Sequence, residues 1–149
     1  MEFSVKEIIN TSLILFSIID ITGNIPIVIS LRNKVGHIQS GKATLVAFII
    51  MLVFLFLGNE LLKLIGIDLA SFAIAGSLII FIMAFEMILG IQIMKDVEAE
   101  TVSIVPLAFP LLAGPGVFTT LLAIRSEYRV ENIVVGIIIN LIFVYIVLN

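Results

Sequence analysis

The chain has 149 residues, of which 61% are hydrophobic and 13% are charged, and its mean hydropathy is +1.30. Soluble domains typically contain about 45–50% apolar and about 25% charged residues, so this composition excludes an ordinary water-soluble domain. The net charge is −3 and no long basic cluster is present, so the sequence also argues against a nucleic-acid partner.

Five long apolar stretches contain almost none of the charges. They are Ile8–Leu31, Ala43–Asn59, Leu69–Met94, Thr101–Ile124 and Ile133–Asn149, and only Asp20 and Glu86 carry a charge within them. A helix of about 24 residues spans about 36 Å, more than the hydrocarbon thickness of about 30 Å. The stretches lack the strict alternation of membrane β-strands. The sequence therefore predicts an all-α, polytopic transmembrane helical bundle with the lipid bilayer as its surroundings.

Short polar connections separate these stretches. The first connection is predicted at Arg32–Lys42, and the second span continues past Glu60 and Lys63 to a turn at 66–68. Glu60 and Lys63 are three residues apart and therefore neighbours on one helix face, where they can pair near the membrane interface.

Two of the stretches contain helix-breaking residues. Proline lacks an N–H and clashes with the preceding turn, and glycine makes unusual backbone conformations accessible. The first stretch is broken at Gly23-Asn24-Ile25-Pro26, and the fourth at Pro106, Pro110 and Ala113-Gly114-Pro115-Gly116. Backbone groups freed at membrane depth must face protein, water or a ligand, because lipid cannot bond them.

The broken stretches are the first and the fourth, where a three-plus-three repeat places equivalent helices. With an odd number of spans in each repeat, the second copy is inverted. Paired, interrupted spans are typical of a transporter binding site near the midplane. We expect a single transmembrane domain over residues 1–149, with a first repeat at about 8–94 and a second at about 101–149. The fifth stretch ends at Asn149, so we expect five of six spans here and a sixth downstream.

Polar side chains at the breaks are the candidate functional groups. A carboxylate deep in an apolar span costs ~2.5–3.5 kcal/mol on insertion scales, which favours a role for Asp20 in binding a cation, a proton or a polar substrate. Asn24 lies four residues later, on the same face if the helix is intact. The alternative is a protonated Asp20 that hydrogen-bonds within the bundle. The candidate substrate- or ion-binding residues are Asp20, Gly23, Asn24, Pro26, Pro106, Pro110, Gly114, Pro115, Gly116 and Thr119.

The third stretch offers weaker candidates. Glu86 is either a second functional carboxylate or an anchor near the interface, depending on where its helix ends. Small residues lie roughly on one face of this stretch and predict close helix packing, including a homo-oligomer contact: Ala70, Ala73, Ser77 and Ala84. The hydroxyls of Thr119 and Thr120 in the fourth stretch more often bond their own helix than a ligand.

The sequence does not favour an enzyme. It has no cysteine and a single histidine, His37, in a polar loop. No nucleophile–base set, metal-ligand spacing or phosphate-binding glycine loop is recognisable, so we expect no catalytic residue, metal or cofactor.

Three stretches carry a family resemblance: residues 23–26, residues 74–79 and residues 105–116, the last containing Pro-Leu-Ala-Phe-Pro and Ala-Gly-Pro-Gly. The sequence resembles the MarC family of integral membrane proteins, whose members are similar to the LysE-type exporter superfamily. The resemblance implies an inner-membrane protein of six spans, with the broken first and fourth spans as equivalents. It also implies, by analogy alone, the export of amino acids or other small metabolites.

The sequence therefore predicts a secondary transporter or exporter of small polar, amino-acid-like metabolites, with its site between the two broken helices near the midplane of the inner membrane. The alternative is a non-transporting structural or accessory membrane protein whose kinked helices serve packing.

Overall fold

The computed structural model describes residues 3–90 and 103–149, and within these two ranges the chain is helical, with no strand. The elements in chain order are α1 (Val5–Ile19), α2 (Ile25–Val35), α3 (Ser40–Ile65), α4 (Leu69–Leu89), η1 (Ser103–Leu112), α6 (Pro115–Ile124) and α7 (Val130–Leu148). The predicted all-α bundle is confirmed.

Within the described ranges, three helices are long and apolar enough to cross a membrane: α3, α4 and α7. The pair formed by Ile104–Leu112 of η1 and Pro115–Ile124 of α6 passes the same test as one broken span bent by 42°. The first predicted span consists of α1 with 15 residues and α2 with 11 residues, each shorter than the ~17 residues that a span requires. The second broken pair raises the number of candidate spans in the described residues to four. The fifth predicted span, formed by α1 and α2 together, stays a prediction.

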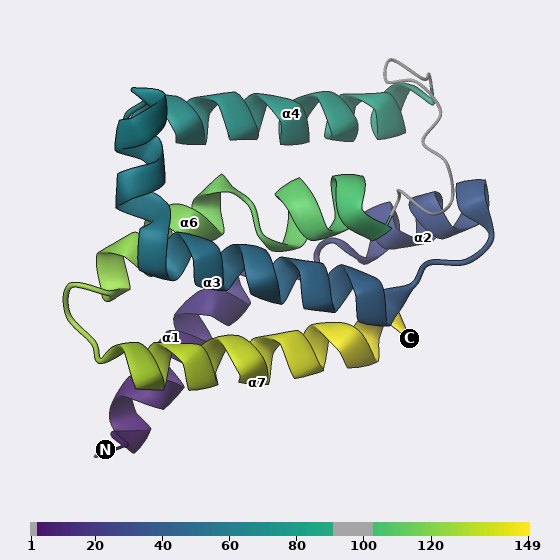
Figure 1. The fold of residues 1–149 in the computed structure, drawn as a ribbon. Helices are drawn as coiled ribbons and strands as arrows, with labels where there is room; N and C mark the ends of the chain where they lie inside the picture. The colour runs from purple at the N-terminus through teal and green to yellow at the C-terminus, as the bar shows by residue number, and fades with distance from the viewer. Residues whose placement is uncertain (1–2, 91–102) are drawn as a thin grey trace.

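Successive segments run in opposite directions along the molecule (Figure 1). α1 and α2 lead from the N-terminal end to the far end, α3 returns, and α4 runs forward again. η1 and α6 then return, and α7 finishes at the far end. α4 lies on one side of the bundle, and α7 lies on the other side, next to α3.

α1 and α7 start side by side and run parallel. At their first turns, Glu7 Oε2 accepts hydrogen bonds from Asn132 Nδ2 at 2.7 Å and from the backbone N–H of Arg129 at 3.1 Å. Arg129 is the N-cap residue of α7, so the Glu7 carboxylate lies at the positive end of that helix. This contact holds the N-terminal ends of both helices together.

The same two helices approach closely one turn further on. A Cβ atom at Gly136 would overlap the side chain of Thr11, which is fully buried. Asn140 Nδ2, one more turn along α7, donates to the Ser12 carbonyl at 3.0 Å. A glycine flanked by side chains that hydrogen-bond across the interface is how helices associate in lipid, where the hydrophobic effect does not drive them together.

The centre of the bundle is built on one face of α3. Its residues at a spacing of four are fully buried: Ala43, Ala47, Met51 and Leu55. Phe54 of α3 stacks on the buried Phe118 of α6, with ring centroids 3.7 Å apart, and Phe72 of α4 stacks on both rings. These contacts bind α3, α4 and α6 together around the second broken segment.

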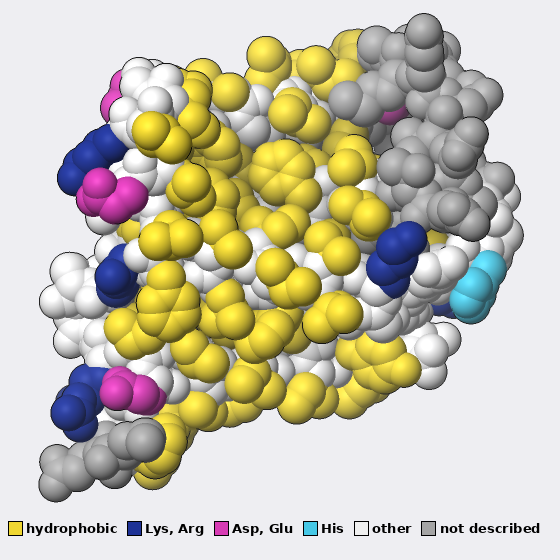
Figure 2. Space-filling model, in the orientation of Figure 1, with side chains coloured by type: hydrophobic (Ala, Val, Ile, Leu, Met, Phe, Trp, Pro, Cys, Tyr) yellow, Lys and Arg dark blue, Asp and Glu magenta, His cyan; other side chains and the backbone are white. Residues whose placement is uncertain are grey.

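The outer surface fits a lipid environment. Hydrophobic side chains cover the middle of the face drawn in Figure 2, and the coloured charged side chains lie toward its two edges. Large apolar side chains on α3, α4 and α7 are exposed, among them Leu45, Ile49, Leu78, Phe81, Ile142 and Ile146. Such a belt between two charged rims is the pattern expected of a bilayer-spanning bundle.

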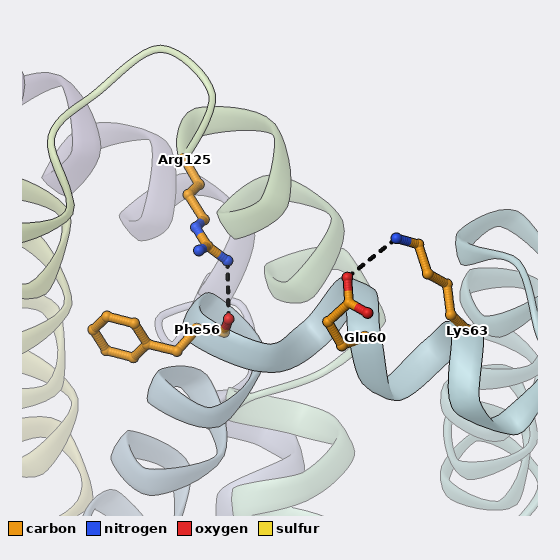
Figure 3. A network of polar contacts seen from close by, with 4 residues as sticks. All are labelled: Phe56, Glu60, Lys63 and Arg125. Atoms are coloured by element: carbon orange, nitrogen blue, oxygen red, sulfur yellow. Dashed lines mark hydrogen bonds and ion pairs between the residues drawn. The ribbon is translucent and has the colours of Figure 1, made fainter.

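The polar connection predicted at Arg32–Lys42 is shorter than expected. α2 continues to Val35 and α3 begins at Ser40, which leaves only residues 36–39 outside the helices. Gly36 ends α2 with a φ of 78°, a conformation that glycine adopts at little cost. The turn predicted at 66–68 is confirmed, as is the Glu60–Lys63 pair, whose Nζ and Oε1 atoms lie 3.1 Å apart (Figure 3).

Two helix breaks as a candidate binding site

The first break is a five-residue turn between α1 and α2. Asp20 ends α1 in the left-handed region, with φ 41° and ψ 49°, and its N–H donates to the Phe16 carbonyl. Its Oδ1 accepts from the backbone N–H of Gly23 at 3.2 Å and from Thr22 Oγ1 at 3.3 Å. Aspartate tolerates this backbone conformation better than most residues because its side chain bonds locally. Asp20 therefore shapes the turn with one oxygen.

The second oxygen of Asp20 is available. The side chain is exposed, and no group in the described part of the chain donates to Oδ2. A carboxylate has about four acceptor positions, so the bonds to Oδ1 do not exhaust it. Asp20 is thus both part of the local structure and a free acceptor.

Asn24 is half-buried at the start of α2. Its Nδ2 donates to the Ile19 carbonyl at 3.0 Å, which satisfies a backbone group left open at the end of α1. Pro26 lies exposed in the first turn of α2, where its missing N–H costs no helical bond. Asp20 and Asn24 were expected to share one face only if the helix were intact. It is broken between them, so that arrangement is absent.

The second break is longer and more buried. Inside η1, Val105 and Phe109 have extended backbone angles, and the next residue in each case is a proline. Pro106 and Pro110 are both buried. The N–H of Ala113 donates to the Ala108 carbonyl at 2.9 Å, one residue wider than an α-helical bond. The prolines thus replace regular helix with wide, irregular turns inside the protein.

α6 begins directly after this irregular segment. Gly114 is buried, and a Cβ atom there would overlap the Pro110 carbonyl oxygen. Pro115 is the first residue of α6, and Gly114 provides no side-chain cap for it. The N-terminus of α6 therefore has no side-chain cap and presents the positive end of a helix dipole.

Thr119 and Thr120 follow the second break. Both hydroxyls donate to the Gly116 carbonyl, at 2.9 Å from Thr119 and 2.8 Å from Thr120. This is the local bonding that threonines in helices usually make. The Thr119 side chain is half-buried. Its role in binding a ligand stays a prediction.

The two breaks are neighbours in space. A Cβ atom added at Gly116, at the start of α6, would lie 3.4 Å from Cγ2 of Ile18, two residues before Asp20. The C-terminal end of α1, which is the negative end of its dipole, therefore lies against the positive end of α6. The candidate residues at both breaks thus belong to one region of the molecule.

Glu86 lies away from this region. α4 ends at Leu89, so Glu86 lies in its last turn, and its side chain is half-buried. That position agrees with an anchor near the interface.

Of the predicted packing face of α4, Ala70 and Ser77 are exposed and Ala73 and Ala84 are half-buried. A homo-oligomer contact through them stays a prediction, as do the absence of a metal and of a cofactor.

Two arginines that the sequence analysis did not single out bond to helix backbones. Arg125 Nη1, at the end of α6, donates to the Leu55 carbonyl at 2.6 Å and to the Phe56 carbonyl at 3.1 Å (Figure 3). Arg32 Nη2, in α2, donates to the Leu148 carbonyl at 2.6 Å. Arginine in a loop next to an apolar run usually indicates a solvated interface residue, so no sequence signal pointed to these bonds.

The family comparison covers almost the whole chain. The family that matches, over residues 5–149, is described as "MarC family integral membrane protein". The chain belongs to the MarC family. It is therefore an integral, multi-pass membrane protein, as the apolar helices indicate.

This MarC-family chain is similar to proteins named "UPF0056 membrane protein". It is 38% identical to one from Buchnera aphidicola subsp. Schizaphis graminum, covering 76% of this chain and 58% of the relative. It is 33% identical to one from Aquifex aeolicus, covering 75% and 58%, and 30% identical to one from Archaeoglobus fulgidus, covering 76% and 59%. The chain thus spans about three-fifths of the length of these relatives. No solved structure matches it.

Two of the three stretches that carry the MarC resemblance are in direct contact in the fold. Residues 23–26 cover the end of the first break and the start of α2, and residues 105–116 cover the second break. Residues 74–79 lie on α4 and include Gly76, where a Cβ atom would overlap the ring of Pro115. The second and third stretches thus meet at the start of α6, where Ile18 of α1, just before the first break, also lies.

Proposed function

We propose that this MarC-family chain takes part in secondary transport of a small polar, amino-acid-like metabolite, with the substrate held between the two helix breaks. The observation that carries the proposal is the contact between Ile18 and Gly116, because it joins the breaks in one region. Adjacent broken helices near the middle of a bilayer are the arrangement in which transporters bind their substrates.

The charges around the breaks support a zwitterionic substrate. Asp20 Oδ2 has acceptor capacity for an ammonium group, next to the negative end of α1. The N-termini of α2 and α6 have no side-chain cap and favour a carboxylate. An amino-acid-like molecule carries both groups on one carbon, so it complements both ends of this region.

The proposed location is the inner (plasma) membrane. Chains that cross as apolar helices satisfy their backbone within each segment, whereas outer-membrane-type proteins are closed barrels with much weaker hydrophobic segments. The helices α3, α4 and α7 are of the first kind.

Reconstituted liposomes provide the test. The protein is reconstituted into liposomes that are loaded with a panel of labelled amino acids. Efflux driven by a proton gradient is then compared between the wild type and Asp20→Asn. Asparagine keeps an oxygen for the Gly23 N–H but removes the charge. Loss of a charged hydrogen bond predicts a decrease of about tenfold or more in efflux. Asp68→Asn, a carboxylate in the connection between α3 and α4, is the matched control and should leave efflux unchanged. Equal efflux in the wild type and Asp20→Asn would remove Asp20 from the mechanism.

A non-transporting accessory role is the second candidate. It is favoured by the bonds within the first break, where Asp20 Oδ1 and Asn24 Nδ2 satisfy backbone groups of the turn itself. Under this role the breaks serve packing, and no tested amino acid crosses the liposome membrane above the rate of empty liposomes.

A further inference from the structure

A groove between α3 and α7 opens on the outer surface of the bundle. Its lining extends from Gly41 to Phe48 on α3 and from Ile138 to Tyr145 on α7, and its volume is about 560 Å³. The two helices run antiparallel, so the start of α3 and the end of α7 lie at the same end of the groove (Figure 1). The lining covers seven residue steps of each helix, which is about 10 Å. The groove therefore runs along the helix axes, the direction in which acyl chains lie in a bilayer.

The inside of the groove is apolar. Leu141 is buried beneath it, whereas Leu45 and Ile142 are exposed on its two sides. Thr44 also lines it, but its hydroxyl donates to the Ser40 carbonyl of its own helix at 2.9 Å. An apolar groove of this kind on a lipid-facing surface accommodates a hydrocarbon chain.

The end of the groove at the start of α3 is polar. A Cβ atom added at Gly41 would lie 3.9 Å from Cε2 of Tyr145, the atom next to the carbon that carries the hydroxyl. The hydroxyl end of this ring is therefore close to the first turn of α3. Lys42 follows Gly41 in that turn, and α3 has no side-chain cap, so the positive end of its dipole adds to the charge of Lys42. A phenol and an ammonium group both donate hydrogen bonds to phosphate oxygens.

Basic residues predominate at this end of the molecule. Residues 21–59 contain Arg32, Lys34 and Lys42 but no acidic residue. Figure 2 shows Lys or Arg side chains and the histidine at the end of the drawn face where α3 begins. In the described part of the chain, the acidic residue at this end is Glu86, and its helix α4 lies on the opposite side of the bundle from α7 (Figure 1). Basic clusters beside a membrane span attract anionic lipid headgroups.

A second copy of this chain fits the groove less well. Two copies inserted in the same direction in one membrane would meet with their basic ends side by side, where like charges repel. An anionic phospholipid complements both parts of the groove, since its acyl chain matches the apolar length and its phosphate matches the basic end.

We propose that the groove between α3 and α7 binds one anionic phospholipid of the bilayer. An acyl chain lies between the two helices, and the headgroup phosphate lies at the first turn of α3, where Lys42 and Tyr145 donate to it. The site is on the outer surface of the bundle, and the inference does not depend on the proposed transport function.

Native mass spectrometry of the chain in detergent tests this binding. Phosphatidylglycerol and phosphatidylcholine with the same acyl chains are titrated separately into the delipidated protein. We expect phosphatidylglycerol to bind about fivefold more tightly, which is the effect of one lysine near an anionic surface. Lys42→Gln should remove most of this preference. Lys63→Gln, which removes a lysine at the opposite end of α3, is the matched control and should leave the preference unchanged.

A second pair of variants tests the groove itself. Gly41→Leu adds a large side chain to the lining at a position where a Cβ atom has no neighbour closer than 3.9 Å, so the fold should accept it. We expect the binding of both phospholipids to decrease several-fold. Ala75→Leu, at an exposed position of α4, is the control and should not change it. If the Gly41→Leu protein does not fold, Ile138→Trp fills the groove from α7 instead.

Four results would overturn the proposal. The first three are equal affinity for the two phospholipids, an equal loss of preference in Lys42→Gln and Lys63→Gln, and unchanged binding after the groove is filled. The fourth is a dimer that excludes both phospholipids and dissociates in Gly41→Leu, because a second copy would then occupy the groove.

Discussion

Gly76 of α4 and Pro115 of α6 are in direct contact, and a Cβ atom at Gly76 would overlap the proline ring. α4 is otherwise a largely exposed helix, with only 11% of its spanning window buried within the described structure. The missing side chain at Gly76 thus lets α4 lie close to the second break. The position of α4 depends on this contact and on the stacking of Phe72 with Phe54 and Phe118.

Substitution of Gly76 tests this contact. Gly76→Ala forces α4 and α6 apart or distorts the Pro115 ring, and overpacking of this kind costs about 1–3 kcal/mol. The free energy of unfolding is measured in detergent micelles by circular dichroism during titration with a denaturing detergent. Ala75→Leu, on the exposed surface of α4, is the control and should change stability little. A Gly76→Ala protein as stable as the wild type would contradict the close contact.

The contact between α1 and α7 predicts a rescue. Gly136→Ala places a methyl group against Thr11 and is expected to destabilise the protein by about 1–3 kcal/mol. Thr11→Ser removes the Cγ2 atom that lies nearest to the new methyl group. In a double-mutant cycle, Thr11→Ser should recover part of the loss, because the two side chains are in contact. Strictly additive effects would show that α1 and α7 do not meet at these residues.

The helices and their breaks could be predicted because they are local properties. Apolar runs of sufficient length predict spans whatever their neighbours, and proline disfavours the interior of a regular helix, so the prolines at 26, 106, 110 and 115 mark places where a helix starts or is interrupted. The end of α2 and the start of α7 were predicted less well, since polar residues outside an apolar stretch can continue its helix. Gly36, for example, ends α2 after Arg32 and its neighbours have continued it.

The contacts between helices could not be predicted from the sequence alone. The polar side of α7, with Asn132, Gly136 and Asn140 at a spacing of four, does carry a readable signal for close packing. It does not say that α1 is the partner. For the same reason the sequence predicts Asp20 as a binding group or as a protonated side chain bonded within the bundle, and does not show that its Oδ1 accepts from the Gly23 N–H, a contact that exists only once the turn has formed.

Asp68 predicts a pH dependence outside the spans. It is the N-cap residue of α4, and hydrogen bonds from the backbone N–H and the hydroxyl of Ser71, both at 2.8 Å, hold the pKa of its carboxyl below the ordinary value of 3.8. A lowered folded-state pKa means that this carboxylate stabilises the fold above the ordinary pKa, and that the contribution disappears as the pH falls through the folded-state pKa.

Thermal unfolding of Asp68→Ala therefore depends on pH. At neutral pH its midpoint should lie below that of the wild type, because the cap is lost. The difference should narrow as the pH falls below about 4, where the wild-type carboxylate becomes protonated. Asn33→Ala, an exposed residue of α2 without a titrating group, controls for general effects of acid. A difference that is constant over the whole range would show that the charge of Asp68 contributes nothing.

Asn24 gives a test of the first break that does not depend on transport. Its Nδ2 donates to the Ile19 carbonyl, so Asn24→Asp replaces a donor with an acceptor that faces another acceptor. The Asp20 carboxylate, in the same turn, adds repulsion. A half-buried carbonyl left unpaired costs about 1–3 kcal/mol, which should appear as an equal loss in the free energy of unfolding. Asn33→Asp makes the same chemical change at an exposed position of α2 and should have little effect. If both variants are equally stable, the Asn24 side chain does not close the break, and the turn must be held by Asp20 alone.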